Sequence, residues 1–363
     1  MPVNRDPVTE LMARGVADAV FPGAVLLFAR RNEILYHRAF GVADLRTRHP
    51  VATDAVFDLA SLTKPLATAM AMLVLVQEQK LHLNTCLEAL FPGTENTPKG
   101  KITLDMLLRH TSGLPAHREY FKMIAGRPDP LQAIQELILA EPLEDIPGRC
   151  ELYSDLGYML LARVIETVTQ IRLDRFVRKH VYAPLGIEDL FFIDLEKKRL
   201  PVNPDRMIST RDCPWRGRVL TGEVEDENAW VCGGVQGHAG LFGTAGAIHA
   251  LCVEIMGAIE KRPARVLNPS VAAAFIKKHP GRTRVAGFDT PSKTGSAAGR
   301  YFSSRAVGHL GFTGTSFWMD PKTGLMVILL TNRVHPSRSA QKIKQFRPAL
   351  HDCIVQFLKM TPP

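Results

Sequence analysis

The sequence predicts an α+β fold in which a single sheet, built from both ends of the chain, carries a mostly helical insert. Stretches with strand character lie near the two ends, at residues 23–41 and 311–332. Apolar residues at helical spacing dominate the chain between them, from Thr63 to about Leu200. A chain of 363 residues is long enough for one large domain with an insertion or for two smaller domains.

The N-terminal third begins with a short helix, predicted over residues 6–20. Residues 23–41 then predict two strands joined at Arg31-Asn32, which is a hairpin signal. The segment 102–115 predicts a short helix that stops at Gly113 and Pro115, because these residues disfavour helix continuation.

The middle of the chain predicts a helix over 155–171, with Asp155 as its N-cap. Residues 200–245 are rich in glycine, proline and charge and predict long loops. Helical patterning returns over 241–259, and residues 267–279 predict an ordinary amphipathic helix.

In the C-terminal part the spacing of apolar residues changes from helical to strand-like. Residues 311–332 predict a strand, a turn with the sequence D-P-K-T-G, and a second apolar strand, which together form an antiparallel hairpin. A final helix is predicted from about Ser339 to Leu358.

Composition excludes several classes of protein. The net charge is +9, but the basic residues are spread in ones and twos, so we expect a solvated surface and no nucleic-acid partner. The six cysteines lack C-x-x-C spacing and the histidines lack H-E-x-x-H, which predicts no disulfide framework, no metal site and no cofactor. The oligomeric state is not predicted.

No membrane or export segment is expected. The N-terminal residues are mixed and amphipathic, unlike a signal peptide, and the longest apolar run, near Ala67–Val76, is too short to span a bilayer. The sequence therefore predicts a cytoplasmic protein, or a periplasmic or secreted one if a leader has been removed.

Ser61 and Lys64 form an S-x-x-K pattern at the start of a long apolar helix. Positions i and i+3 share one helix face, so the hydroxyl and the amine can meet. The positive end of the helix dipole and partial burial are both expected to lower the pKa of Lys64 towards that of a usable base. A serine beside such an amine is a good nucleophile. The alternative is structural, with Ser61 as an N-cap and Lys64 as a solvated first-turn residue.

Two further motifs occur in order along the chain, and they favour the catalytic interpretation. The three together are Ser61-Leu62-Thr63-Lys64, Tyr153-Ser154-Asp155 before a helix, and His309-Leu310-Gly311 at the start of a strand. With these motifs the chain resembles the serine β-lactamase and penicillin-binding protein superfamily, specifically its class C branch of β-lactamases, DD-peptidases and esterases. The resemblance covers nearly the whole chain.

The resemblance implies a β-lactamase/transpeptidase-like fold, in which an antiparallel sheet is flanked by helices. It implies one catalytic domain over 1–363, with a sheet subdomain from 1–59 and 260–363, a helical subdomain from 60–259, and the active site in the cleft between them.

The resemblance also implies the role of each site residue. Ser61 is acylated, while Lys64 and Tyr153 share the proton transfers. The backbone N–H groups of Ser61 and Phe312 form the oxyanion hole. An unperturbed tyrosine is a poor base at neutral pH, so nearby lysine charge is expected to lower the pKa of Tyr153.

Two departures from the family pattern bear on the substrate, which Asp155, His309 and Gly311 are expected to bind. Asp155 stands where asparagine is usual, and a carboxylate only accepts hydrogen bonds. His309 stands in place of lysine and weakens a fixed positive charge. We therefore expect cleavage of a small-molecule acyl substrate: an ester, or a D-alanyl peptide or β-lactam. The alternative is a penicillin- or cell-wall-fragment-binding protein with little turnover.

Other candidates have structural interpretations. Two K-T-G triplets occur: Lys322-Thr323-Gly324 is expected to be the hairpin turn, and Lys293-Thr294-Gly295 a surface loop. The remaining candidates are polar residues in loops. His110 is expected to be a structural loop residue. His238 and Gln236 either line the pocket or, as favoured, stabilise a glycine-rich turn; Asp226, Glu227 and Asn228 either bind a cation or substrate amine or, as favoured, form an exposed acidic loop.

Overall fold

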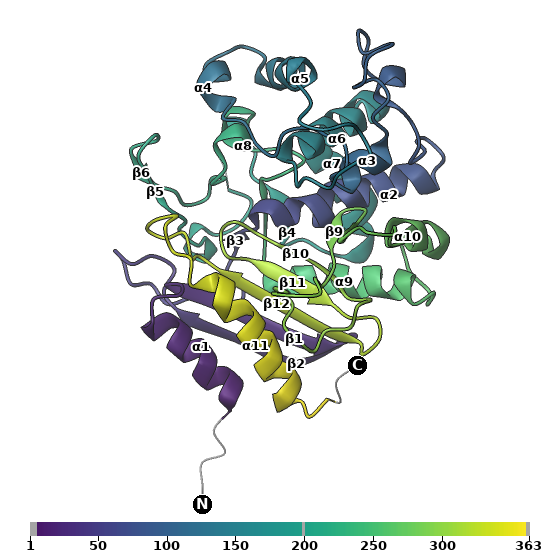
Figure 1. The fold of residues 1–363 in the computed structure, drawn as a ribbon. Coiled ribbons are helices and arrows are strands. Elements are labelled where there is room, and N and C mark those ends of the chain that lie inside the picture. Colours follow the sequence, from purple (N-terminus) through teal and green to yellow (C-terminus); the bar gives the residue numbers. More distant parts are fainter. Residues whose placement is uncertain (1–5, 198–199, 361–363) are drawn as a thin grey trace, which may run out of the picture.

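A computed structural model describes residues 6–197 and 200–360 (Figure 1). Its main sheet has seven strands in the order β2-β1-β12-β11-β10-β9-β8, and every neighbouring pair is antiparallel. The strands are β1 (Gly23–Arg30), β2 (Glu33–Gly41), β8 (Arg284–Val285), β9 (Phe288–Asp289), β10 (Val307–Leu310), β11 (Ser316–Met319) and β12 (Leu325–Thr331). The predicted α+β fold, with a sheet built from both chain ends, is confirmed.

The two ends of the chain meet at the pairing of β1 with β12, where Ala24 lies opposite Thr331 and Arg30 opposite Leu325. Both strands are almost continuously apolar because both faces of the sheet are covered. Helices α1 (Pro7–Ala17) and α11 (Ile343–Phe357) pack on one face, and α9 (Ala245–Ile259) packs on the other (Figure 1).

The helical insert contains a core segment made of three consecutive helical stretches. These are a 3₁₀ turn at Ala60–Leu62, a π-helical turn at Lys64–Ala69, and α2 (Met70–Gln77). By length and composition the stretch Ala60–Gln77 is able to cross a membrane, but 83% of it is buried inside the fold. The other helices are α3 (Leu104–Leu108), α4 (Phe121–Ile124), α5 (Pro130–Ala140), α6 (Asp155–Thr169), α7 (Leu173–Val177), α8 (Glu227–Val231) and α10 (Pro269–Phe275).

A small sheet fixes the chain just before the core segment. Strand β7 (Leu241–Gly243) pairs with β3 (Phe57–Asp58) on one side and with β4 (Leu190–Phe192) on the other. A two-stranded hairpin, β5 (Asp212–Cys213) with β6 (Arg218–Val219), lies in the loop-rich region.

Several predicted boundaries were wrong. The N-cap of α6 is Ser154, whose hydroxyl accepts from Gly157 N, and not Asp155. Helix α3 ends at Leu108, where His110 takes a left-handed conformation (φ 59°) before Gly113 is reached.

Two other elements differ from the prediction near the sheet. The stretch 241–243 is the strand β7 and not helix, and α11 begins at Ile343 rather than near Ser339. His309 lies in β10, before the turn that leads into β11, and so does not open the predicted strand.

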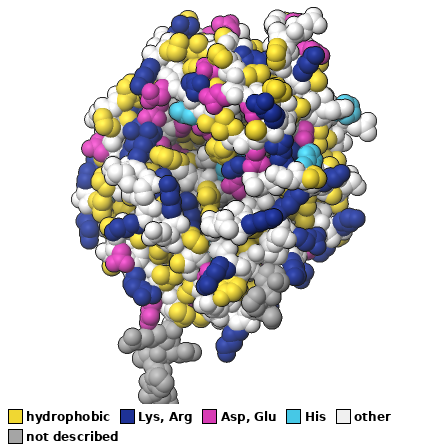
Figure 2. All heavy atoms as spheres, viewed as in Figure 1, with side chains coloured by type: hydrophobic (Ala, Val, Ile, Leu, Met, Phe, Trp, Pro, Cys, Tyr) yellow, Lys and Arg dark blue, Asp and Glu magenta, His cyan; other side chains and the backbone are white. Residues whose placement is uncertain are grey.

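The surface agrees with the dispersed charge seen in the sequence. Figure 2 shows Lys and Arg side chains scattered over the visible face and interleaved with acidic ones. The predicted division into a sheet subdomain and a helical subdomain (60–259) stays a prediction; α9, within the second range, packs on β1 and β12.

Candidate active site

Ser61 lies on the 3₁₀ turn that opens the buried core segment. The residue before it, Ala60, has φ 48°, which is uncommon for a residue with a side chain. The chain stabilises this conformation on both sides. Asp58 Oδ1 accepts from Ala60 N at 2.8 Å, and the Thr63 hydroxyl donates to Ala60 O at 2.7 Å while accepting from Leu241 N at 3.0 Å. None of the three helical stretches of this segment has a side-chain hydrogen bond at its N-cap, so Ser61 is not an N-cap.

Lys64 is fully buried beneath Ser61. Its Nζ lies 3.0 Å from Ser61 Oγ, 3.1 Å from His238 O and 2.8 Å from Asp155 Oδ1. An ammonium group has three N–H donors, and these three acceptors match them. The predicted contact between the serine and the lysine is therefore present, whereas the solvated first-turn lysine is not.

The ring of Tyr153 lies next to Lys64. Lys64 Nζ is 4.9 Å from the Tyr153 ring centroid, and Lys64 and Ser61 both act to lower the pKa of Tyr153 against burial. The ring packs on His110, with centroids 4.4 Å apart, and His110 Nδ1 accepts from Ser154 N at 2.9 Å. His110 thus has the structural role that was expected and supports the tyrosine.

The protonation states differ from the expectation. Burial acts to lower the pKa of Lys64, but the Asp155 carboxylate and Tyr153 more than offset it, so that the pKa of Lys64 is raised. Burial also raises the pKa of Tyr153, and the lysine charge offsets this only in part. At rest, the site therefore holds a charged lysine and a neutral tyrosine.

Asp155 carries the negative charge of the centre. Burial acts to raise its pKa, but the interactions with Lys64, His117 and His238 together outweigh burial and hold the pKa far below the usual range. Its second oxygen lies 3.1 Å from His117 Nδ1, and this contact raises the pKa of His117. His117 comes from the 115–150 loops, and sequence reasoning missed it because nothing local links it to Asp155.

The turn between β10 and β11 lies beside the serine. Thr313 Oγ1 donates to Asp58 O at 2.8 Å, and Thr315 Oγ1 donates to Leu59 O at 3.1 Å, which ties this turn to the strand before Ser61. Gly311 is required here, because a Cβ would lie 1.9 Å from Thr315 Oγ1. Phe312, 47% exposed, faces the same cavity as Ser61.

His309 is not at the surface of that cavity. It is 2% exposed, its Nδ1 donates to Leu310 O at 2.9 Å, and its ring centroid is 6.0 Å from that of Tyr153. Burial lowers the pKa of His309 to about 4. The residue is neutral at pH 7 and provides no fixed positive charge for a substrate.

The cavity has a volume of about 310 Å³, and charged side chains are frequent among its lining residues. Its lining residues are Asp58, Ala60, Ser61, His117, Tyr153, Asp155, Glu225, Asp226, Glu227, His238, Ala239, Phe312 and Arg338. Among the described residues, no group of three or more His, Cys, Asp or Glu side chains is suited to hold a metal ion.

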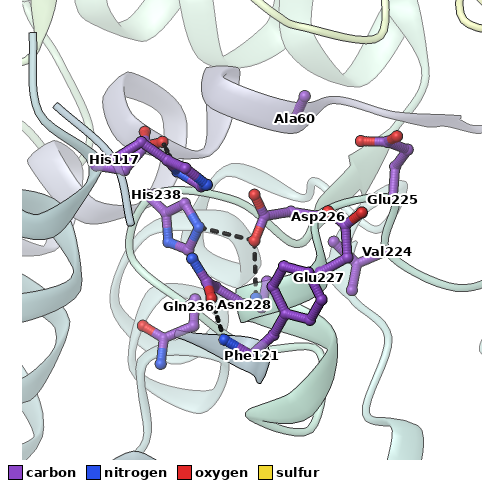
Figure 3. A network of polar contacts seen from close by, with 12 residues as sticks. Ala60, His117, Phe121, Val224, Glu225, Asp226, Glu227, Asn228, Gln236 and His238 are labelled. Atoms are coloured by element: carbon purple, nitrogen blue, oxygen red, sulfur yellow. Dashed lines mark hydrogen bonds and ion pairs between the residues drawn. The ribbon is translucent and has the colours of Figure 1, made fainter. Parts of the chain in front are cut away.

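The acidic segment 225–227 is one wall of this cavity (Figure 3). The expected exposed loop is wrong: Glu225 is 4% exposed, and Asp226 and Glu227 are half-buried. His238, 1% exposed, also lines the cavity, contrary to the favoured interpretation. Gln236 is buried and is not among the lining residues, and Asn228 instead accepts from Phe121 N at 2.8 Å.

Besides His117, three charged lining residues had no place in the sequence prediction: Asp58, Glu225 and Arg338. Asp58 was detectable as a carboxylate inside the apolar stretch V-F-D-L-A just before Ser61. Both its oxygens accept buried backbone N–H groups, from Ala60 and from Glu225 at 2.7 Å. The K-T-G triplets behave as expected: one is the turn between β11 and β12, and Lys293-Thr294-Gly295 is exposed.

Comparisons with known proteins agree over most of the chain. A family model described as Beta-lactamase matches residues 8–350. Proteins named D-alanyl-D-alanine carboxypeptidase from Salmonella heidelberg and Salmonella typhimurium are 32% and 31% identical over 357 residues, which cover 90% of this chain and 82% of each relative.

Solved structures share the fold. The octameric penicillin-binding protein homologue from Pyrococcus abyssi matches with a TM-score of 0.73 at 20% identity, covering 100% of this chain and 78% of that one. EstCE1, a hydrolase with promiscuous acyltransferase activity, matches with a TM-score of 0.72 at 20% identity, covering 96% and 97%. The expected β-lactamase/transpeptidase-like fold is confirmed.

Proposed function

This chain belongs to the β-lactamase family, and on that premise we propose that it is a serine hydrolase that forms an acyl-enzyme on Ser61. The observation that carries the proposal is the 3.0 Å contact of Lys64 Nζ with Ser61 Oγ at the wall of a cavity of small-molecule size. The proposed substrate is a carboxylic ester or a D-alanyl peptide, with a β-lactam as the third candidate. The names of the Salmonella relatives and of EstCE1 support the first two.

The proposed first step needs a base. Lys64 and Tyr153 together hold one proton too many at rest, because the lysine is charged and the tyrosine neutral. Once this pair releases a proton to solvent, it accepts the proton of the Ser61 hydroxyl as Oγ bonds to the substrate carbonyl carbon. The carbonyl electrons move to the oxygen, and we assign the backbone N–H groups of Ser61 and Phe312 to stabilise that oxyanion.

The second step releases the products. The pair gives its proton to the leaving oxygen or nitrogen as the carbon–leaving-group bond breaks, and an ester to Ser61 remains. Water then attacks that ester, its proton passes to the same pair, and Ser61 regains a proton as it leaves. Each half-reaction therefore returns Lys64 and Tyr153 to the deprotonated state in which the pair accepts a proton.

A nucleophile substitution tests the proposal. Ser61→Ala is expected to abolish hydrolysis of a p-nitrophenyl ester and to keep the melting temperature of the unaltered protein. The exposed serine of α10 offers a matched control, Ser270→Ala. Retention of most activity by Ser61→Ala refutes the proposal.

The proton-transfer pair is tested separately. Lys64→Ala and Tyr153→Phe are each expected to lower kcat/KM by about 10³ or more, because residues that act as one unit lose most of the rate when either is removed. Hydrolysis of the same ester, measured at several pH values, checks this. A loss of less than tenfold in both variants contradicts the assigned roles.

The second candidate is a binding protein with little turnover. The raised pKa values of both Lys64 and Tyr153 favour it, since a site without a ready base deacylates slowly. Mass spectrometry after exposure to a penicillin separates the two. A permanent adduct on Ser61 with no ester turnover supports the binding protein, whereas rapid loss of the adduct supports the hydrolase. The cytoplasmic location and the absence of nucleic-acid partners stay predictions.

A further inference from the structure

The cavity beside Ser61 is lined by five carboxylates, and most of their oxygens already have partners. The Asp58 oxygens accept backbone N–H groups, and the Asp155 oxygens face Lys64 and His117. One arginine, Arg338, also lines the cavity, and it pairs with two of these carboxylates.

Glu225 and Glu227 hold that arginine in place. Arg338 Nε lies 2.6 Å from Glu225 Oε1, and its second nitrogen lies 2.8 Å from Glu227 Oε2. Arg211 contacts the same two glutamates from the other side. Arg338 is therefore part of a four-residue ion-pair network, in which its positive charge is paired with two glutamates.

Asp226, unlike Glu225 and Glu227, has no arginine on its carboxylate among the described residues. Its Oδ1 accepts both Ala229 N at 2.8 Å and His238 Nε2 at 3.0 Å. Its Oδ2 accepts no hydrogen bond from any residue within 6–197 and 200–360, and it points away from His238 towards Ala60 (Figure 3). The free oxygen thus lies on the side of the nucleophile's turn.

His238 supplies a second buried polar atom at the cavity wall, Nδ1. Burial acts to raise the pKa of Asp226, but its contacts with His238 and with Ala229 N lower it, so the carboxylate is ionised and only accepts hydrogen bonds. Nε2 of His238 therefore carries a hydrogen in its contact with Asp226, and Nδ1 is the other ring nitrogen. This buried atom has no partner among the described residues, and its side chain is 1% exposed at the cavity wall.

The free carboxylate oxygen of Asp226 calls for a ligand group that donates. An ammonium group offers three N–H donors, no acceptor and a positive charge, whereas a carboxylate is repelled by the ionised Asp226. The electrostatic field of this wall also favours a cation, because Asp155, Asp226 and Glu227 all act to raise the pKa of His117 across the cavity. We propose that the substrate carries an ammonium group near its scissile carbonyl and that Asp226 binds it. This inference rests on the proposed function and names its substrate class.

A charge series of chromogenic esters tests it. The p-nitrophenyl esters of 3-aminopropanoate, butanoate and succinate place a cation, a methyl group or an anion at the same distance from the carbonyl. The expected order of kcat/KM, after normalisation to each ester's rate with hydroxide, is cation above neutral above anion. A hydrogen bond to a charged group predicts about tenfold or more for the first step. Equal rates, or a preference for the succinate ester, overturn the proposal.

Substitution of Asp226 locates the effect. Asp226→Asn keeps the shape and the Oδ1 acceptor but removes the charge, so the ratio of kcat/KM for the cationic ester to that for the neutral ester is expected to fall about tenfold. The matched control is Glu119→Gln, an exposed carboxylate that pairs with Lys122 outside the cavity. An unchanged ratio in a folded Asp226→Asn protein contradicts the role of Asp226. If that variant does not fold, the wild-type series decides alone.

A binding measurement separates failure of this inference from failure of the proposed function. Butylammonium is expected to raise the melting temperature more than butanol or butanoate does, with or without turnover. If no ester is hydrolysed through Ser61 but butylammonium stabilises the protein, the hydrolase proposal fails and the cation site stands. If the neutral ester is hydrolysed through Ser61 without any charge preference and no amine stabilises the protein, the cation site alone fails.

Discussion

Among single residues, Asp155 has the largest effect on the charge of the proposed reaction centre. Its carboxylate lies 2.8 Å from Lys64 Nζ and raises the pKa of that lysine despite complete burial. The sequence pattern of the class C branch has asparagine at this position, and asparagine keeps the acceptor without the charge. The base form of the Lys64–Tyr153 pair is therefore reached at a higher pH here than it is with asparagine.

The substitution Asp155→Asn is expected to shift the pH–rate profile. Hydrolysis needs the deprotonated pair, so kcat/KM rises with pH; without the carboxylate, that rise is expected about one pH unit or more lower. The profile of p-nitrophenyl butanoate hydrolysis between pH 6 and 10 measures it. Asp174→Asn, which removes a carboxylate paired with Arg172 away from the cavity, is the control. An unmoved profile is inconsistent with the charge assignment.

Among the structural elements, the turn between β10 and β11 depends on the C-terminal helix. Arg347 of α11 is 5% exposed and donates to Gly311 O at 3.2 Å and to Thr315 O at 2.9 Å. Burial lowers the pKa of Arg347 to about 9, so it is still charged at neutral pH. Through these two bonds α11 fixes the turn that presents Phe312 to the cavity, and Arg347 is a positioning residue.

The substitution Arg347→Met is expected to lower kcat more than it raises KM. Methionine keeps the length of the side chain but removes the arginine donor from two turn carbonyls, and a small displacement of a proposed oxyanion donor costs about 10- to 100-fold in rate. Steady-state kinetics on the neutral ester separate the two constants. Arg300→Met removes an exposed arginine paired with Asp352 of the same helix and is the control. A change in KM alone argues against positioning.

In the whole molecule, buried titratable groups act in opposite directions on stability. His309 and His351 have pKa values lowered to about 4 by burial, while burial raises the pKa of Asp58 to about 7. Between pH 6.5 and 4 the unfolded chain binds protons on the two histidines that the folded protein does not, which lowers the free energy of unfolding as pH falls. Asp58 binds its proton first in the folded state and opposes this loss.

The contribution of His351 to the pH dependence of stability can be measured separately from that of the other buried groups. The substitution His351→Gln removes a buried group whose pKa is about 4. Relative to this variant, the unaltered protein is expected to lose about 2 kcal/mol of unfolding free energy between pH 7.5 and 5. Urea denaturation at both pH values measures it, with His279→Gln at an exposed site as the control. A difference that does not change with pH contradicts the assignment.

Features that depend on residues close together in the sequence were predicted, whereas features that depend on distant residues were not. The β1–β2 hairpin, the helix starting at residue 155 and the S-x-x-K contact depend on neighbours within a few positions, and local patterns predicted them. The acidic wall does not: Glu225, Asp226 and His238 meet Ser61 only after β3, β7 and α8 pack together. The pKa of Lys64 moved opposite to expectation for the same reason, since its cause is a carboxylate 91 positions away.

The pairing of β1 with β12 has a consequence for synthesis on the ribosome. Until Leu325–Thr331 emerge, β1 has only β2 beside it, and its other apolar edge stays open. A growing polypeptide already contains Ser61 and Lys64 at that stage, but the sheet strand that follows Phe312 lacks its inner neighbour. Turnover by the nascent enzyme is therefore expected to begin only after Leu325–Thr331 have emerged, and until then the open edge of β1 is a site for aggregation.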